Sequence, residues 1–242
     1  MSTSRSAAEK EHATRVRSMF ANISARYDLL NHLLSGSLDK RWRHRVARQL
    51  AGYVGSDGLI LDVACGTGDL SFALLDATKA RVFGTDFCRP MLGVAQRKAA
   101  KQSAAVPFVE GDALSLPFAS DSFDGVTIAF GLRNLANFAG GLRELFRVTR
   151  PGGSVVILEF SKPTVPGFRA LFQFYFHCVL PLLGGAVSGS KSAYEYLPDS
   201  VSRFPDQNEL AAMLREVGFE KVEYSNLTGG VAAIHFGTKP GS

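Results

Sequence analysis

The sequence predicts an α/β domain in which a parallel sheet carries helices on both faces and finishes with an antiparallel hairpin. Between residues 58 and 160, short apolar runs alternate with helical stretches, and this alternation is typical of parallel sheets. Residues 220–240 then contain two strand-like runs joined at Thr228-Gly229-Gly230, which is a hairpin signature. A hydrophobic content of 46% over 242 residues suits a soluble globular protein with a substantial core.

The first 50 residues contain only helical patterns. Residues 16–37 indicate one or two short helices that break at Ser35-Gly36-Ser37. In residues 38–50 a helix is expected, because four apolar side chains recur every fourth residue. These are Leu38, Trp42, Val46 and Leu50. We therefore expect an N-terminal helical extension over residues 1–50 and one domain over residues 51–242, with an insertion at about 162–204.

Positive charge is concentrated in this extension. The whole chain carries a net charge of +5, and residues 1–50 hold ten Lys or Arg against four Asp or Glu. The faces of the 38–50 helix beside its apolar stripe are basic, with Lys40, Arg41, Arg43, Arg45 and Arg48. Two interpretations stay open: a helix packed on the domain with a solvated basic face, or a surface that meets anionic lipid or an anionic ligand.

Strands and helices follow one another from residue 58 onward. Five strands are expected, at 58–64, 80–87, 106–114, 123–134 and 154–160. The helices between them are expected at 70–78, 90–102 and 138–150. Pro90 favours a helix start and Pro151-Gly152-Gly153 favours a helix end. After residue 190, Pro205 and Asp206 open an amphipathic helix that Gly218 closes.

The loop at residues 62–69 reads "DVACGTGD" and joins the first strand to a helix. Gly66 and Gly68 allow a sharp turn and a close approach to a ligand. A dinucleotide fingerprint would require Gly or Ala at position 71, where Ser71 stands, and the loop has no lysine of the phosphate-binding type. The loop therefore disfavours NAD and ATP.

Acidic residues end the first three strands. Asp62 precedes the loop, where it would repel a pyrophosphate but attract an ammonium or a sulfonium group. Asp86 is placed to accept hydrogen bonds from a ribose diol, and Asp112 with Ala113 can face an adenine edge. This combination favours S-adenosylmethionine as the ligand. The spacing of Cys and His residues predicts no metal site.

Several segments resemble the menaquinone/ubiquinone C-methyltransferases (the UbiE/MenG type). They are "RYDLLNHLLSGSLDKRW", "LDVACGTGDL", "FGLRN", "RVTRPGGSVVILEFSKP" and "FPDQNELAAMLREVGFEKVEYSNLTGGVAAIH". The resemblance implies the class I methyltransferase fold, a Rossmann-like sheet of seven strands with the last one antiparallel. It also implies methyl transfer to a ring carbon of a demethylated polyprenyl quinol drawn from the membrane, either demethylmenaquinol or a 2-polyprenyl-6-methoxy-1,4-benzoquinol.

By matching position, the resemblance makes Thr67, Asp86, Asp112 and Ala113 cofactor contacts. Together with the residues of the glycine loop, the expected cofactor-binding set is Asp62, Gly66, Thr67, Gly68, Asp86, Asp112 and Ala113. The chain also departs from the family pattern at three positions. The family usually has His where Asp39 stands and Met where Leu30 stands, and many members have Ser where Ala129 stands.

Methylation of a quinol carbon requires a hydroxyl that loses its proton and a donor that stabilises the oxygen. Arg133 and Asn134, at the end of the fourth strand, are the expected stabilising pair. Arginine keeps its proton at its usual pKa and therefore cannot serve as the base, so it is assigned electrostatic stabilisation. His177 is the expected catalytic histidine. Tyr194, Tyr196 and His32 are the other candidate bases, although each of these residue types is more often packed or solvated than catalytic.

The sequence bears on three other functions. Nucleic-acid methylation is disfavoured, because "FGLRN" replaces the usual Asn/Asp-Pro-Pro-aromatic motif and the basic residues form no broad phosphate track. We therefore expect no nucleic-acid partner. A methyltransferase for another small aromatic or lipid substrate stays open. So does a non-catalytic protein that binds a quinone or lipid.

Residues 170–190 contain no charged side chain over 21 positions. The sustained apolar part ends near Leu183 and is too short to span a bilayer. Since the stretch follows the fifth strand, we expect a lid whose Phe172, Phe176, Val179 and Leu183 form part of an isoprenoid-binding wall. Packing into the protein's own core is the alternative.

The N-terminal 15 residues lack the apolar segment of a secretory signal. The three cysteines, Cys65, Cys88 and Cys178, are too few and too scattered for a disulfide framework. We expect a cytoplasmic protein with reduced thiols, and peripheral contact with the inner face of the membrane stays open. The oligomeric state is open too, a homodimer included.

Overall fold

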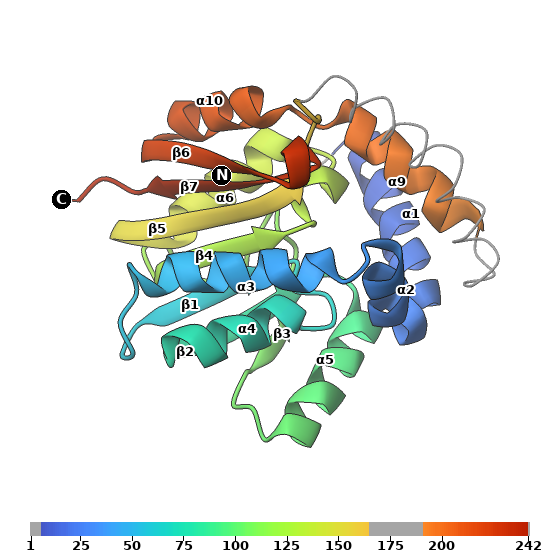
Figure 1. Cartoon of the computed structure of the whole chain (residues 1–242), viewed down its shortest axis with the longest axis horizontal. Coiled ribbons are helices and arrows are strands. Elements are labelled where there is room, and N and C mark those ends of the chain that lie inside the picture. The colour runs from blue at the N-terminus through green and yellow to red at the C-terminus, as the bar shows by residue number, and fades with distance from the viewer. Residues whose placement is uncertain (1–5, 165–190, 242) are drawn as a thin grey trace.

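The computed structural model describes residues 6–164 and 191–241, which fold around one seven-stranded sheet (Figure 1). The strand order is β3-β2-β1-β4-β5-β7-β6. Strands β1 to β5 pair in parallel, and β7 runs antiparallel to both β5 and β6. The strands are β1 (Leu59–Val63), β2 (Arg81–Asp86), β3 (Phe108–Glu110), β4 (Phe123–Ala129), β5 (Thr149–Phe160), β6 (Glu220–Leu227) and β7 (Ala232–Thr238). The expected fold class, including the C-terminal hairpin, is confirmed.

Helices cover both faces of the sheet. Helices α3 and α4 pack together on one face, and α6 and α10 pack together on the other. The α-helices are α1 (Ala7–Ile23), α2 (Tyr27–Leu34), α3 (Leu38–Ala51), α4 (Asp69–Thr78), α5 (Arg89–Gln102), α6 (Phe138–Val148), α9 (Lys191–Arg203) and α10 (Gln207–Val217). Short 3-10 helices are η1 (Ser24–Arg26), η2 (Leu132–Asn134) and η4 (Thr228–Gly230).

Strand β5 shows how the two faces share the core. Val156 and Leu158 pack into the cluster under α3 and α4, whereas Val155 and Ile157 pack into the cluster under α6 and α10. All four side chains are fully buried. Successive side chains of a strand point to opposite faces, so a continuous apolar run is the pattern required for a strand that is covered twice.

Several element boundaries differ from the expected ones, among them the third strand, expected over 106–114 and found at Phe108–Glu110, and the fifth, which begins at Thr149 rather than 154. The helix expected at 138–150 ends at Val148, and Thr149 already pairs with Phe123 in the sheet. The first helix starts at Ala7 rather than near residue 16, with Ser6 and Glu9 forming a capping box. Residues 7–15 are mostly polar, so hydrophobic periodicity gave no signal there. The expected caps of α10, Asp206 and Gly218, are confirmed.

Helix α3 packs its apolar stripe on the domain. Trp42, Val46 and Leu50 are buried in the core, and the exposed residues around them include Lys40, Arg41, Arg45 and Arg48. The prediction that Arg43 belongs to the exposed basic face is wrong, because only 8% of this residue is exposed. Its guanidinium pairs with Asp39 one turn earlier. The division into an extension and a domain at residue 50 stays a prediction.

Some expectations concern residues that the structure leaves undescribed. His177 and the expected wall residues lie outside the described residues; the latter are Phe172, Phe176, Val179 and Leu183. Of the expected insertion, residues 162–164 and helix α9 are described. Among the described helices, none has the length and apolarity needed to cross a bilayer. Cys65 and Cys88 are free thiols.

Candidate active site

The glycine loop turns from the end of β1 into the start of α4. Gly66 and Gly68 have φ angles of +55° and +86°, a region that favours glycine. At Gly68 a Cβ atom would lie 2.9 Å from the Phe108 ring, so both the backbone angle and the space require glycine there. The loop is thereby held against β3.

Asp86 ends β2 and fixes this loop. One carboxylate oxygen accepts from the Gly66 amide at 2.8 Å, and the other accepts from the Cys88 amide at 2.8 Å. Burial raises the pKa of Asp86 to about 6 despite these bonds. Since each carboxylate oxygen has two lone pairs, Asp86 retains acceptor capacity for the hydroxyl groups of a ligand.

Asp62 lies deeper, with 1% of its surface exposed. Its oxygens accept from Ser71 Oγ at 2.6 Å and from Thr127 Oγ1 at 3.0 Å. Burial raises its pKa to about 7. Ser71, which occupies the position of the missing third glycine, therefore holds the acid that precedes the loop.

A cavity lies at the carboxyl ends of the strands, where ligands of parallel sheets bind. It brings together three of the expected cofactor residues with one of the expected catalytic pair. These are Asp86, Asp112, Ala113 and Asn134. Asp62, Thr67 and Arg43 instead line a small neighbouring cavity, and the two cavities share Tyr27, Ala64 and Ala129.

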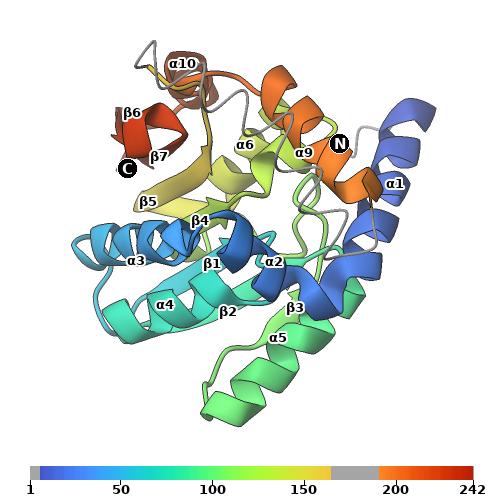
Figure 2. The ribbon, with the colours of Figure 1, turned by 45° about the vertical axis from the view of Figure 1, so that its right-hand side comes forward.

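The first helix closes the outer side of the larger cavity. Glu9, His12 and Phe20 line it from α1. The His12 ring lies 3.0 Å from the backbone oxygen of Asn134 through Nε2, and the Arg17 guanidinium lies 5.4 Å from the centre of the Phe87 ring. Figure 2 shows α1 running beside α9 along this edge of the molecule, and the two helices are in contact. The N-terminal segment is thus part of the site.

Tyr27 and Arg43 are site residues that the sequence did not single out. A Cβ atom at Gly66 would lie 4.0 Å from Tyr27, so the ring borders the glycine loop. Burial raises the pKa of Tyr27, although Arg43 and Arg133 act to lower it. Tyr27 falls in the "RYDLLN" segment that carried the family resemblance, which was the available signal. Arg43 gave no such sequence signal, because it stands among exposed basic residues of the same helix.

Arg133 and Asn134 occupy η2, directly after β4. Arg133 Nη1 donates to Glu159 Oε1 at 2.7 Å and to the Phe130 carbonyl at 2.6 Å, and the Arg133 amide donates to Glu159 Oε2 at 3.2 Å. Both charged groups are buried. Asn134 Nδ2 donates to the same Phe130 carbonyl at 3.2 Å. The two expected catalytic residues therefore share one rigid turn.

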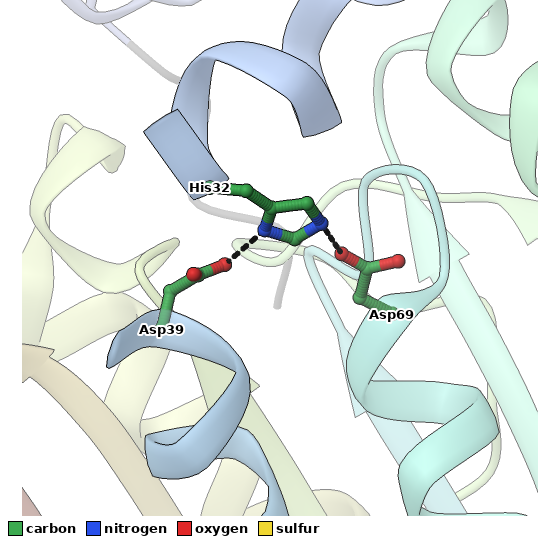
Figure 3. Close-up of side chains that lie close together, drawn as sticks. All are labelled: His32, Asp39 and Asp69. Atoms are coloured by element: carbon green, nitrogen blue, oxygen red, sulfur yellow. Dashed lines mark hydrogen bonds and ion pairs between the residues drawn. The ribbon is translucent and has the colours of Figure 1, made fainter. Parts of the chain in front are cut away.

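His32 lies between two carboxylates (Figure 3). Its Nδ1 is 2.9 Å from Asp39 Oδ2, and its Nε2 is 3.8 Å from Asp69 Oδ2. Burial alone would raise the pKa of Asp39, but Arg43, Ser35 and His32 together lower it. Because the two ring nitrogens point in opposite directions, the imidazole itself fills the space where an ion shared by these three residues would sit. Within the described residues this is the one His/Cys/Asp/Glu group with metal-site spacing, and its geometry does not suit a metal ion.

A polar network fastens α2 to the glycine loop. Thr67 Oγ1 donates to Asp28 Oδ1 at 2.5 Å. Lys98, on α5, donates to Asp28 at 2.9 Å and also to Asp69 at the start of α4. The hydroxyl of Thr67, expected to contact a cofactor, is therefore engaged by the protein, as is His32, one of the candidate bases.

The residues around the larger cavity fit S-adenosylmethionine. The lining contains carboxylates that can accept hydrogen bonds from a ribose and an adenine, and the described lining contains no lysine or arginine that would bind a pyrophosphate. Asp62 and Asp86 contribute negative character near the glycine loop, which suits a sulfonium and an ammonium group. The chemistry of the lining thus agrees with the ligand expected from the sequence.

The chain matches the family model described as the ubiE/COQ5 methyltransferase family over residues 8–239. A demethylmenaquinone methyltransferase of Thermus thermophilus is 51% identical, over 92% of this chain and 100% of that protein. A ubiquinone/menaquinone biosynthesis C-methyltransferase UbiE of a Geobacter species is 46% identical, over 95% of this chain and 98% of that protein.

Solved structures with low sequence identity share the fold. A SAM-dependent methyltransferase of Thermotoga maritima aligns with a TM-score of 0.63 at 18% identity, over 93% of this chain and 99% of that one. The [4+2]-cyclase SpnF aligns with a TM-score of 0.63 at 19% identity, over 82% of each chain. Since such different reactions are carried by similar folds, these likenesses speak to the fold alone.

Proposed function

The chain belongs to the ubiE/COQ5 methyltransferase family, and from that premise we propose that it transfers a methyl group from S-adenosylmethionine to a ring carbon of demethylmenaquinol. The observation that carries the proposal is the cavity at the ends of β1, β2 and β4. There Asp86, Asp112 and Ala113 line the same space as Asn134. A cofactor site and an oxyanion-stabilising residue thus share one cavity.

The cofactor residues have separable roles in this proposal. Asp86 accepts from the ribose hydroxyls, and Asp112 and Ala113 face the adenine. Gly66 and Gly68 let the loop approach the methionine portion of the cofactor. Asp62 supplies negative charge from the end of β1. When bound, S-adenosylmethionine supplies a methyl group on a positively charged sulfonium. The closed outer side of the cavity, formed by α1, excludes water from that group.

The quinol must be activated at the ring carbon. Loss of a hydroxyl proton places negative charge on the quinol oxygen, and this charge flows into the new carbon–methyl bond. The methylated carbon then gives up its hydrogen as a proton and the oxygen regains a proton, so in total one methyl enters and one proton leaves to solvent per turnover. Arg133 and Asn134 stabilise the charged oxygen. Because Glu159 holds the Arg133 guanidinium rigidly, little reorganisation is needed at the moment of reaction.

A polyprenyl benzoquinol is the second candidate substrate. It is favoured by the relatives named ubiquinone/menaquinone biosynthesis C-methyltransferase UbiE, which are 46% identical in Geobacter and 42% identical in Paracoccus denitrificans. The naphthoquinol is preferred here because the 51% and 45% identical relatives from Thermus and Deinococcus are named demethylmenaquinone methyltransferase.

The test is a methylation assay with the purified full chain. Protein, S-adenosylmethionine and either reduced demethylmenaquinone or a reduced 2-polyprenyl-6-methoxy-1,4-benzoquinone are combined, and the product mass is measured. A gain of one methyl group on the naphthoquinol is expected. A gain on the benzoquinol alone would favour the second candidate, and no gain on either would refute the proposal.

A polyprenyl substrate resides in the membrane, so the enzyme must reach it there. Arg41, Arg45 and Arg48 recur at helical spacing on the exposed side of α3, and none forms an ion pair with the part of the chain that the structure describes. We assign this face of α3 to contact with anionic headgroups, each cation contributing about 1 kcal/mol near the surface.

This contact is tested by co-sedimentation with phosphatidylglycerol-containing vesicles. Replacing Arg41, Arg45 and Arg48 with Gln should reduce binding. A matched variant with Gln at the exposed Lys79, Arg81 and Lys101 loses the same charge elsewhere and should bind as the parent does. Equal losses in the two variants would assign the attraction to net charge rather than to α3.

A further inference from the structure

Three buried polar atoms without a hydrogen-bond partner lie on two neighbouring elements. They are Arg133 Nε, Asn134 Oδ1 and the hydroxyl of Tyr196, none of which has a partner among the described residues. Arg133 and Asn134 belong to η2, Tyr196 belongs to α9, and α9 packs against η2. A buried polar group left unpaired costs about 1–3 kcal/mol, so three in one region call for an explanation.

Hydrogen bonds hold other atoms of Arg133 and Asn134 in place. Arg133 Nη1 is bonded to Glu159 and to the Phe130 carbonyl, and Asn134 Nδ2 donates to the same carbonyl. The bond from Asn134 Nδ2 fixes the orientation of the Asn134 amide, so its oxygen must point away from the Phe130 carbonyl. The unpaired atoms are therefore the ones that these two side chains keep available for a ligand.

Charged residues of both signs act on the hydroxyl of Tyr196. Burial raises the pKa of Tyr196, the guanidinium groups of Arg133, Arg203 and Arg15 oppose this rise, and Asp199 adds to it. The phenol is therefore protonated at neutral pH and can donate a hydrogen bond. This argues against a role as a base, which was one of the roles considered from the sequence.

We propose that Tyr196 binds the reacting hydroxyl of the quinol and, together with Arg133, stabilises the oxygen as it becomes negatively charged, while Asn134 orients the hydroxyl before its proton leaves. The inference rests on the proposed function and adds a substrate-binding residue to it. The three atoms match the needs of such a group. Asn134 Oδ1 accepts the hydroxyl hydrogen, and Arg133 Nε and the phenol donate to the oxygen.

The same hydrogen-bonding atoms also suit the later stage of the reaction, in which the quinol oxygen is charged. Once the hydroxyl proton has passed to solvent, the two donors remain bonded to an oxygen whose negative charge is greater than in the bound quinol. Their hydrogen bonds are consequently stronger while the ring carbon is nucleophilic, which is the condition for raising kcat rather than only lowering KM. The proton removed from the oxygen is replaced by the one that the methylated carbon releases.

The test is Tyr196→Phe, which removes only the hydroxyl. We expect kcat for demethylmenaquinol to fall about 10²-fold, the size of the loss when one oxyanion donor is removed. The Kd for S-adenosylhomocysteine should be unchanged. The melting temperature should be equal or higher, because an unpaired buried hydroxyl disappears. Tyr53→Phe is the matched control, since Tyr53 is 59% exposed and packs on Phe236; it should behave as the parent in every measurement.

Substrate acidity gives a readout that a structural role would not move. A demethylnaphthoquinol with an electron-withdrawing chlorine on its benzenoid ring forms its anion more easily. The loss caused by Tyr196→Phe should therefore be smaller for the chlorinated quinol than for the parent quinol. An unchanged kcat, a loss equal for both quinols, or a lower melting temperature with proportionally weaker cofactor binding would each overturn the inference.

Failure of the proposed function would be recognised separately. If the parent protein methylates neither quinol, the proposed function fails, and the inference is then judged by the binding of short-chain demethylnaphthoquinol measured by calorimetry. Binding that weakens about tenfold or more in Tyr196→Phe but not in Tyr53→Phe would uphold the hydroxyl subsite. Absent or equal binding would overturn it. If the parent methylates the naphthoquinol and Tyr196→Phe does so equally well, only the inference fails.

Discussion

The hydroxyl of Thr67 donates to the carboxylate of Asp28 across 2.5 Å, although 39 residues separate them in the sequence. This bond joins the loop that the sequence marked as a cofactor-binding turn to the helix that carries Tyr27 into the site. The conformation of the glycine loop is therefore coupled to the packing of the N-terminal helices on the domain, and the affinity for the cofactor should depend on both.

Asp28→Ala should weaken the binding of S-adenosylhomocysteine about tenfold. The change removes the Thr67 bond and one partner of Lys98, and charge-assisted hydrogen bonds contribute about 1.5–3 kcal/mol each. Calorimetric titration measures the effect. Asp57→Ala, at an exposed position, is the control and should bind normally. Normal binding by Asp28→Ala would show that the loop keeps its shape without α2.

Asp86 should make cofactor affinity depend on pH. Because burial raises its pKa to about 6, the carboxylate is protonated in the free protein below that pH and accepts poorly from ribose hydroxyls. The Kd for S-adenosylhomocysteine should rise by up to about tenfold for each pH unit below 6. Asp86→Asn should bind more weakly and lose most of this dependence. A parent Kd that stays constant between pH 5 and 8 would contradict the assignment.

Asp62 should lower the stability of the free protein as the pH rises. Its folded pKa of about 7 lies above its unfolded value of 3.8, so its favourable contribution is complete below about pH 4 and is lost as the pH rises through 7. Relative to the parent, Asp62→Asn should gain up to about 4 kcal/mol in unfolding free energy between pH 4 and 8. Urea denaturation at a series of pH values measures the difference. Asp76→Asn, on the exposed side of α4, is the matched control. A pH-independent difference between Asp62→Asn and the parent would refute the prediction.

Gly131 should tolerate no side chain. A Cβ atom there would lie 2.5 Å from the Cβ of Ala64, although the backbone angle of Gly131 suits any residue. Gly131→Ala would force β1 and η2 apart at the cavity, at a cost of about 1–3 kcal/mol. Both the melting temperature and methyl transfer should fall. Gly55→Ala meets open space and should leave both unchanged. A Gly131→Ala protein with parental stability would show that η2 can shift freely.

Substitutions at Arg133 and Glu159 should affect the free energy of unfolding and methyl transfer differently. Arg133→Met leaves Glu159 buried and unpaired, which costs about 3–5 kcal/mol. The double variant Arg133→Met/Glu159→Gln removes both charges and should recover much of the unfolding free energy in urea. Methyl transfer should stay low in both, because the charge that stabilises the quinol oxygen is missing. Recovered activity in the double variant would assign Arg133 a purely structural role.

The strand pattern and the glycine loop were predictable because both are local. Apolar runs ending in acids located β1, β2 and β3 to within a few residues, and the hairpin was marked by its turn. The end of α6 was misjudged because Thr149 and Arg150 fit a helical pattern as well as a strand. What decided between them was pairing with β4, which lies more than 20 residues away.

The burial of Arg43 shows the limit of sequence patterns at the site. By position it is one of five basic residues around an apolar stripe, and its one local distinction from Arg41 and Arg45 is the acid four residues earlier, Asp39. That pairing does not by itself predict burial, which depends on Asp69 from α4 and Tyr27 from α2 approaching the guanidinium. Tyr27 was likewise visible only as part of a family motif.

The sequence by itself determined that the core of the domain is a parallel sheet, that a glycine turn follows the first strand, and that acids end the first three strands. These features depend on neighbours along the chain and on the geometry common to parallel sheets. The tertiary structure decided which polar atoms remain unpaired after folding. Thr67 and His32 are engaged by distant carboxylates, whereas atoms of Arg133, Asn134 and Tyr196 are left without partners in the described structure. Hydrogen-bond satisfaction depends on contacts between segments far apart in the chain, and no local pattern contains that information.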